Sequence, residues 1–155
     1  MLDAEMRMKL LISDRPWEHE PDREEWVHDL TRYRCWIWRH PTFGALNGYV
    51  AIPMGHQAWG KHYDSIDVDV HCGLTYAEED KVTGEWVVGF DCNHVDDFAP
   101  KLAVTMMKYV DQDPESMEFR MRSGKYRGWA YVKEQVCSLA RQLKILNLPN
   151  EGEVK

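Results

Sequence analysis

The sequence lacks a long apolar run and any paired cysteine spacing. A membrane-spanning helix needs about 18 consecutive apolar residues, and the run at Lys9–Ile12 is also too short for the core of a signal peptide. Cys35, Cys72, Cys92 and Cys137 are scattered without C-x-x-C spacing. We therefore expect no membrane partner, four reduced thiols and a cytoplasmic location.

Positive charge is also scarce. The chain has 19 Lys and Arg against 26 Asp and Glu, a formal charge of -7, which opposes binding to long nucleic acids and anionic membranes. No internal repeat or low-complexity segment is present. A length of 155 residues with 44% hydrophobic residues predicts a single domain over residues 1–150, followed by a flexible tail at 151–155.

Periodicity predicts an α+β fold, in which a mainly antiparallel sheet packs against a long C-terminal helix and a shorter N-terminal helix. Alternation of apolar and polar residues predicts strands at Tyr33–Arg39, Leu46–Ile52, Ile66–Tyr76 and Glu85–Asp91. Helical spacing predicts helices at Pro21–Leu30, Pro100–Val110 and Tyr126–Asn147. Met1–Ile12 fits a strand or a short helix equally well.

One predicted strand carries an unusual row of polar residues. Ile66, Val68 and Val70 alternate with Asp67, Asp69 and His71, so the two carboxylates and the imidazole share one face. Asp is depleted in strands, and like charges on one face repel each other. The row therefore marks a candidate site, although a solvated sheet face would give the same pattern.

Pairing of the Ile66–Tyr76 and Glu85–Asp91 strands brings more polar residues to this row. With a turn near residues 79–81, His71 lies opposite residue 90 and the row meets the end of the second strand. Mixed oxygen and nitrogen ligands suit Zn, Mn or Mg, and such an ion can activate a water for hydrolysis. The predicted metal ligands are Asp67, Asp69, His71, Asp91 and His94, of which Asp69, His71 and Asp91 are the predicted catalytic groups.

Two other chemistries remain open. His71-Cys72 and Cys92-x-His94 have the residue types of a zinc site or a cysteine nucleophile, but strand parity points both thiols to the core. A metal-free pocket would use the Met54–Tyr63 loop, expected to wall the site, and a basic run around residues 120–127 that suits phosphate. Its predicted ligand-binding residues are His56, Trp59, Lys61, Tyr63, Arg120 and Arg122.

Several motifs resemble small uncharacterised proteins encoded in bacteriophages and prophages. They are Y-V-A-I-P-x-G-H at 49–56, I-D-V-D-V-H-x-G-L-T-Y at 66–76, W-x-x-G-F-D-C-x-H at 86–94 and the Y-R-x-x-x-Y-V helix start at 126–132. In that family a second glycine follows the histidine, where this chain has Cys72. The departure argues against Cys72 as a general nucleophile.

The resemblance implies a phage-type accessory protein acting in the host cytosol. Together with the polar row, it predicts a small-molecule site, with metal-dependent hydrolysis of a phosphorylated or nucleotide-like compound as the leading function. The alternatives are a non-catalytic sponge for a host nucleotide signal and a protein that docks onto and inhibits a host enzyme. The oligomeric state does not follow from the sequence.

Overall fold

The computed structural model describes residues 3–108 and 124–149, except the side chain of Leu11. Five strands form one antiparallel sheet in the order β1-β2-β3-β5-β4. The strands are β1 (Arg23–Val27), β2 (Arg34–Arg39), β3 (Leu46–Ile52), β4 (Tyr76–Glu79) and β5 (Trp86–Asp91). The helices are α1 (Ala4–Leu11), α2 (Pro100–Met107) and α4 (Trp129–Leu146), with 3-10 turns at Pro16–Glu18 and Tyr63–Ser65.

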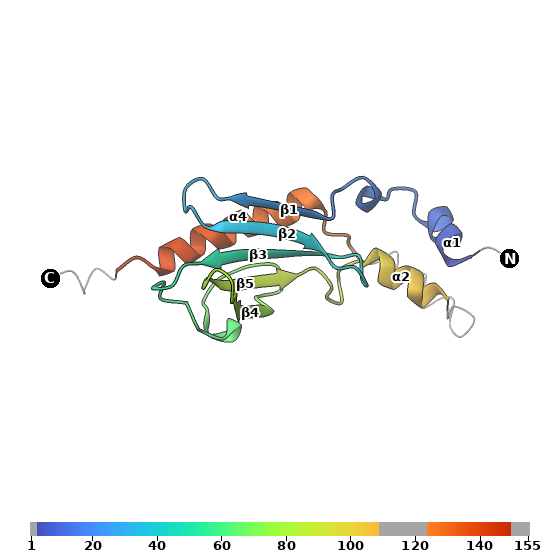
Figure 1. The fold of residues 1–155 in the computed structure, drawn as a ribbon. Helices are drawn as coiled ribbons and strands as arrows, with labels where there is room; N and C mark the ends of the chain where they lie inside the picture. The colour runs from blue at the N-terminus through green and yellow to red at the C-terminus, as the bar shows by residue number, and fades with distance from the viewer. Residues whose placement is uncertain (1–2, 109–123, 150–155) are drawn as a thin grey trace.

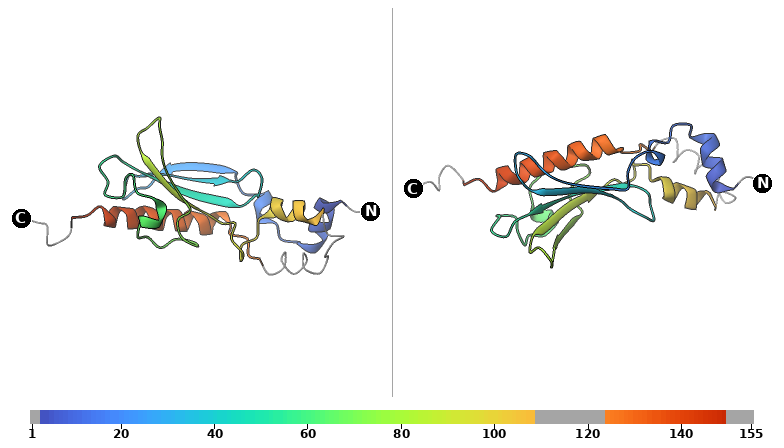
Figure 2. Two further views of the ribbon diagram at one scale, coloured as in Figure 1. Left: turned by 90° about the horizontal axis from the view of Figure 1, so that it is seen from below. Right: turned by 45° about the horizontal axis from the view of Figure 1, so that its top comes forward.

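Helix α4 lies along one face of the sheet, as Figure 1 and both views of Figure 2 show. Helices α1 and α2 lie together beyond one end of the sheet. The predicted α+β class, with a long C-terminal helix and a shorter N-terminal one, is confirmed. Within residues 3–108 and 124–149, every helix falls short of the length and apolar character that crossing a membrane requires.

The core lies between α4 and the sheet. The predicted stripe on the last helix is confirmed: Val132, Val136, Leu139 and Leu143 are fully buried, and Leu146 packs against them. Alternate residues of β2, β3 and β5 meet this stripe, because successive strand side chains point to opposite faces. These residues are Cys35, Ile37, Val50, Val88 and Phe90.

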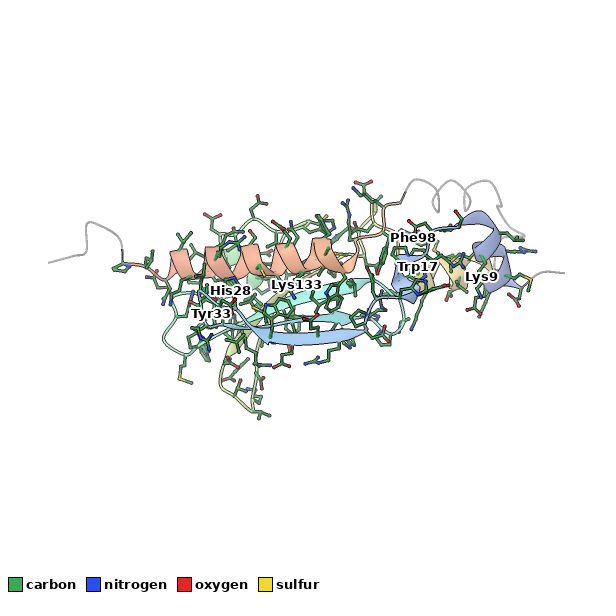
Figure 3. All side chains as sticks on the ribbon, turned by 90° about the horizontal axis from the view of Figure 1, so that it is seen from above. Lys9, Trp17, His28, Tyr33, Phe98 and Lys133 are labelled. Atoms are coloured by element: carbon green, nitrogen blue, oxygen red, sulfur yellow. The ribbon has the colours of Figure 1, made fainter. Side chains whose placement is uncertain are left out.

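A smaller apolar cluster joins α1 and α2. Met8 of α1 and Met107 of α2 are buried there with Phe98. Trp17 closes the cluster, with its ring centre 5.4 Å from that of Phe98, and Figure 3 shows the two side chains next to each other. The cluster extends the body of the protein without reaching the main core.

The helix predicted at Pro21–Leu30 is wrong, because this segment contains strand β1. Trp26 pairs with Cys35 of β2 and lies under α4, where Lys133 Nζ is 4.9 Å from the Trp26 ring centre. Figure 3 shows Lys133 on α4 beside the sheet. A short segment with one partly buried aromatic residue, here Trp26, fits a five-residue strand as well as a turn of helix. The spacing of its apolar residues therefore could not distinguish the two. The N-terminal helix is α1, capped by the Asp3 carboxylate.

The strand predicted at Ile66–Tyr76 is also wrong over most of its length. Only its last residue, Tyr76, belongs to a strand, β4. The burial pattern was right, since Ile66 and Val70 are buried while Asp67 and Asp69 are exposed. The segment is extended, but its backbone is bonded by glutamine side chains of α4 instead of a neighbouring strand.

Two glutamines of α4 replace the missing strand partner. Gln142 accepts from the Asp69 N–H at 2.7 Å and donates to the Asp69 carbonyl at 2.8 Å. Gln135 accepts from the His71 N–H at 2.9 Å. The hairpin register also differs by four residues from the expected one, because Tyr76 pairs with Gly89.

Candidate functional site

His71 lies in a tight turn at the end of this extended segment. The Gly73 N–H donates to the Val70 carbonyl at 2.9 Å, which closes the turn. Cys72 adopts φ of 55°, a left-handed conformation that costs a residue with a Cβ about 1 kcal/mol or more relative to glycine. The turn, together with the bond to Gln135, holds the imidazole beside the N-terminal half of α4.

Asp97 faces His71 from the segment that follows β5. His71 Nε2 lies 2.8 Å from Asp97 Oδ2, and the two side chains are 6% and 1% exposed. Asp97 Oδ1 accepts from Arg127 Nε at 2.9 Å, and Oδ2 also accepts from the His94 N–H at 3.1 Å. Burial alone would raise the pKa of Asp97, but the bonds from His71 and Arg127 outweigh it and lower the pKa. Asp97 is therefore a carboxylate.

The first turn of α4 completes the surroundings. The Tyr131 hydroxyl lies 2.8 Å from His71 Nδ1, and the rings are perpendicular with centres 5.5 Å apart. The Arg127 guanidinium lies 5.2 Å from the Tyr131 ring centre. Because a phenol can donate or accept, Tyr131 suits either neutral tautomer of His71. The imidazole is thus held at both nitrogens.

Cys72 brings a third ligand type to this pair. Its Sγ is 3.6 Å from His71 Nε2, and ligand atoms of His71, Cys72 and Asp97 all lie within 4.8 Å of one another. The three residues could hold a metal ion. The expectation that Cys72 points to the core is wrong, because the residue sits in a turn and its thiol is exposed. Although the residue is exposed, partial desolvation and the nearby Asp97 charge raise the pKa of the Cys72 thiol.

The predicted polar residues divide into two groups. His94 and Asp91 do lie near His71: the His71 and His94 ring centres are 6.0 Å apart, and His94 Nε2 is 3.2 Å from Asp91 Oδ1. Asp91 also accepts from the Thr75 hydroxyl at 2.9 Å. Asp67 and Asp69 are exposed and fall outside the group that converges on His71. The two polar segments meet, but with a different set of carboxylates.

The Met54–Tyr63 loop does not wall this cluster. His56 is 5% exposed, and its Nε2–H donates to the Leu143 carbonyl at 2.7 Å while Nδ1 accepts from the Ala58 N–H at 2.9 Å. Leu143 and Tyr131 are twelve residues apart on α4, about 18 Å along the helix axis. His56 therefore fastens the loop to the far end of α4, with neither ring nitrogen left for a ligand.

The other predicted ligand-binding residues lie away from the cluster or outside the described residues. The Trp59 indole donates to the Gly84 carbonyl, and the Trp86 indole donates to the Lys61 carbonyl, both at 3.0 Å. Tyr63 packs against the main core. These contacts tie the loop to the β4–β5 hairpin. Arg120 and Arg122, like the tail at 151–155, are not among the described residues.

Three residues of the cluster carry little signal in the sequence. Asp97 and Tyr131 were not predicted as site residues, and Arg127 was placed only in a general phosphate-binding run. The spacing His94-x-x-Asp97 is a local signal for a side chain that binds its own backbone. Arg127 precedes α4 by two residues, and its guanidinium folds back over the ring of Tyr131 in the first turn. Neither feature identifies His71 as the common partner.

No protein-family model, curated protein or solved structure matches this chain. The resemblance to phage-encoded proteins therefore stays a prediction. The chemistry of the cluster itself is what supports a function.

The tautomer of His56 leads to a prediction about stability and pH. Burial lowers the pKa of His56 below its usual value of 6.5, and protonation of Nδ1 would break the bond from the Ala58 N–H. Stability from the neutral ring is thus complete above pH 6.5 and lost as the pH falls toward the lower folded-state pKa. We expect His56→Gln to make the free energy of unfolding fall less steeply between pH 7 and 5, by at most about 1.4 kcal/mol per pH unit.

Urea unfolding at several pH values measures this slope. Gln keeps a donor for the Leu143 carbonyl but does not titrate near neutral pH. The control is His19→Gln, since His19 is exposed, and it should leave the slope unchanged. Equal slopes for wild type and His56→Gln would contradict the assignment.

Proposed function

We propose that His71, Cys72 and Asp97 form a zinc site with one open coordination position, which hydrolyses a small anionic substrate of the phosphorylated or nucleotide-like class. The observation that carries the proposal is the convergence of three ligand atoms, two of them on side chains whose other polar atom already has a hydrogen-bond partner. Tyr131 holds Nδ1 of His71, and Arg127 holds Oδ1 of Asp97. Zinc-binding His and carboxylate side chains have such outer partners almost always.

The distance between the His71 and Cys72 ligand atoms suits a tetrahedral centre. With usual zinc–ligand bond lengths, nitrogen and sulfur ligands lie about 3.6 Å apart and nitrogen and oxygen ligands about 3.3 Å apart. His71 Nε2 and Cys72 Sγ are 3.6 Å apart. His71 Nε2 and Asp97 Oδ2 are 2.8 Å apart, so they need to separate by about 0.5 Å. To bind a metal through Nε2, neutral His71 would carry its one proton on Nδ1, for which the Tyr131 oxygen is the acceptor.

One cation at the site, Arg127, offers a contact for a negatively charged substrate. Cys72 is exposed, so a zinc ion held by these three residues would be accessible to solvent, and it would lower the pKa of a bound water to about 7. One thiolate and one carboxylate neutralise the charge of zinc. Arg127, held in place by Asp97 and the Tyr131 ring, adds one positive charge that can pair with an anionic group, while the carboxylates of Asp91 and Asp96 also lie near Cys72.

Metal analysis of Cys72→Gly tests the site without endangering the fold. Glycine removes the ligand and also relieves the left-handed backbone at position 72, so the metal-free variant should be more stable than wild type by about 1 kcal/mol. Wild-type protein purified without an affinity tag should carry one zinc, and the variant none. Zinc at 100 times its dissociation constant should stabilise wild type alone, by about 2.7 kcal/mol.

The matched control is Cys137→Ser, because Cys137 is a half-buried thiol on α4. It should retain the zinc. The same protein is then assayed against p-nitrophenyl phosphate and its diester. Absence of zinc in wild type would overturn the site, whereas zinc without turnover would overturn hydrolysis and favour the non-catalytic sponge.

A further inference from the structure

A groove crosses the face of the sheet opposite α4. Its volume is 320 Å³, within the range of small-ligand sites. Trp36 and Trp38 of β2 line it. The alternate residues of the same strand, Cys35 and Ile37, point toward α4. Figure 2 shows α4 on one side of the sheet and the β4–β5 hairpin rising on the other. The groove is therefore separated by the sheet from the core and from α4.

Aromatic rings make up much of the groove. Trp36 and Tyr49, neighbours across β2 and β3, stack with ring centres 5.3 Å apart. Tyr76 of β4 meets Tyr49 edge to face at 5.6 Å. The Arg34 guanidinium already lies 4.5 Å from the Trp36 ring centre. The aromatic side of the groove thus already has a cation, the Arg34 guanidinium, against a ring face in the free protein.

Carboxylates outnumber cations around the rings. Two arginines lie beside the rings: Arg23 lines the groove and pairs with Glu25 at 3.1 Å, and Arg34 is 3.5 Å from Glu25, 2.9 Å from Asp80 and 3.0 Å from Glu85. Among the described residues Glu79, which also lines the groove, pairs with Lys81, whose side chain is 86% exposed, and such surface pairs are weak. Four carboxylates thus face three cations. Aromatic faces and surplus negative charge both attract a cation and repel an anion.

We propose that this groove binds a small organic cation of the quaternary or methylated ammonium class. The ring faces attract the positive charge, and their apolar surface buries the methyl groups, which bulk water solvates poorly. Glu79 supplies the counter-charge at the rim. The site is independent of the His71 cluster, since none of its residues belongs to that cluster.

Titration with choline, followed by tryptophan fluorescence, tests the proposal. The matched neutral probe is 3,3-dimethylbutan-1-ol, which has the shape of choline without the charge. Choline should bind saturably, the alcohol at least about tenfold more weakly, and added NaCl should weaken choline binding. Equal affinity for the two probes, or no saturable choline binding, overturns the proposal.

Two tyrosines of equal exposure locate the binding. Tyr76→Leu should weaken choline binding about fivefold or more. Tyr131→Leu should not, although Tyr131 is 36% exposed against 37% for Tyr76, because Tyr131 lies on α4. Glu79→Gln keeps every ring and should weaken binding through charge alone. Equal losses in the two tyrosine variants, or full affinity in both Tyr76→Leu and Glu79→Gln, would overturn the assignment.

Discussion

Replacement of Arg39 by Ala is expected to lower the free energy of unfolding by about 3–5 kcal/mol. The Arg39 side chain is only 5% exposed. It donates to Asp22 at 2.9 Å, to the Gly44 carbonyl at 2.9 Å and to the Tyr126 hydroxyl at 2.8 Å. Asp22 is exposed and stays solvated, but removing the guanidinium leaves the Gly44 carbonyl and the Tyr126 hydroxyl without this buried donor, and this costs more than the exchange of one surface charge.

The loss of stability should also affect the start of α4, because Glu20 contacts both Arg39 and that helix. Glu20 lies 3.6 Å from Arg39 and accepts from the Tyr126 hydroxyl at 2.6 Å and from the Trp129 N–H at 2.9 Å. It therefore caps α4 from a distant part of the sequence. Without Arg39, this capping carboxylate keeps its buried charge but loses its counter-ion.

Urea unfolding of Arg39→Ala, Arg39→Lys and Arg23→Ala measures the effect. Lys keeps the charge but cannot reproduce the several directed bonds of the guanidinium, so an intermediate loss is expected. Arg23, on the neighbouring strand, is 53% exposed and pairs with Glu25 at 3.1 Å. Its replacement should cost less than about 1 kcal/mol. A loss below about 1 kcal/mol for Arg39→Ala would mean that the network contributes little.

The sequence predicted which side chains are buried better than it predicted which segments pair as strands. The alternation of Ile66, Asp67 and Val70 correctly gave which side chains are buried. It could not show that two glutamines of α4 hydrogen-bond the extended backbone. An alternating pattern shows only which side chains share a face, and it does not show what the backbone pairs with. The stripe on α4 was correct because a step of three and four over 18 residues fits only a helix.

The site was predicted in part for the same reason. His71 was singled out from its strand-like row, and His94 and Asp91 do approach it. The partner that binds it directly, Asp97, is 26 residues away and belongs to no periodic pattern. Such a contact depends on the path of the chain after β5, which no local propensity encodes. The exposed Cys72 was misplaced because a turn, not a strand, contains it.

Gly48→Ala is expected to cost about 1–3 kcal/mol, because α4 packs directly on this residue. A Cβ at position 48 would lie 2.5 Å from Val136 Cγ2 and 2.6 Å from Phe90 Cζ, closer than real Cβ contacts. Val136 and Phe90 are both fully buried, so neither can move into solvent. The strand and the helix would have to separate.

A double-mutant cycle with Val136→Ala shows whether the contact with the helix sets this cost. Val136→Ala alone should cost about 2 kcal/mol through the space it leaves. In the double variant the new Cβ fills part of that space, so the combined loss should fall short of the sum by about 1 kcal/mol. Unfolding in urea gives all four free energies.

Gly89→Ala provides the matched control for this cycle. Position 89 is equally crowded, with an added Cβ 2.4 Å from Tyr49 Cδ1 and 2.8 Å from the Gly48 carbonyl oxygen, but on the face away from α4. Its loss should therefore add to that of Val136→Ala without coupling. Additivity at Gly48 as well would mean that strand β3 and α4 relax independently. The helix glutamines that hold His71 would then lack a rigid support, and the geometry of the proposed metal site would not be fixed by the core.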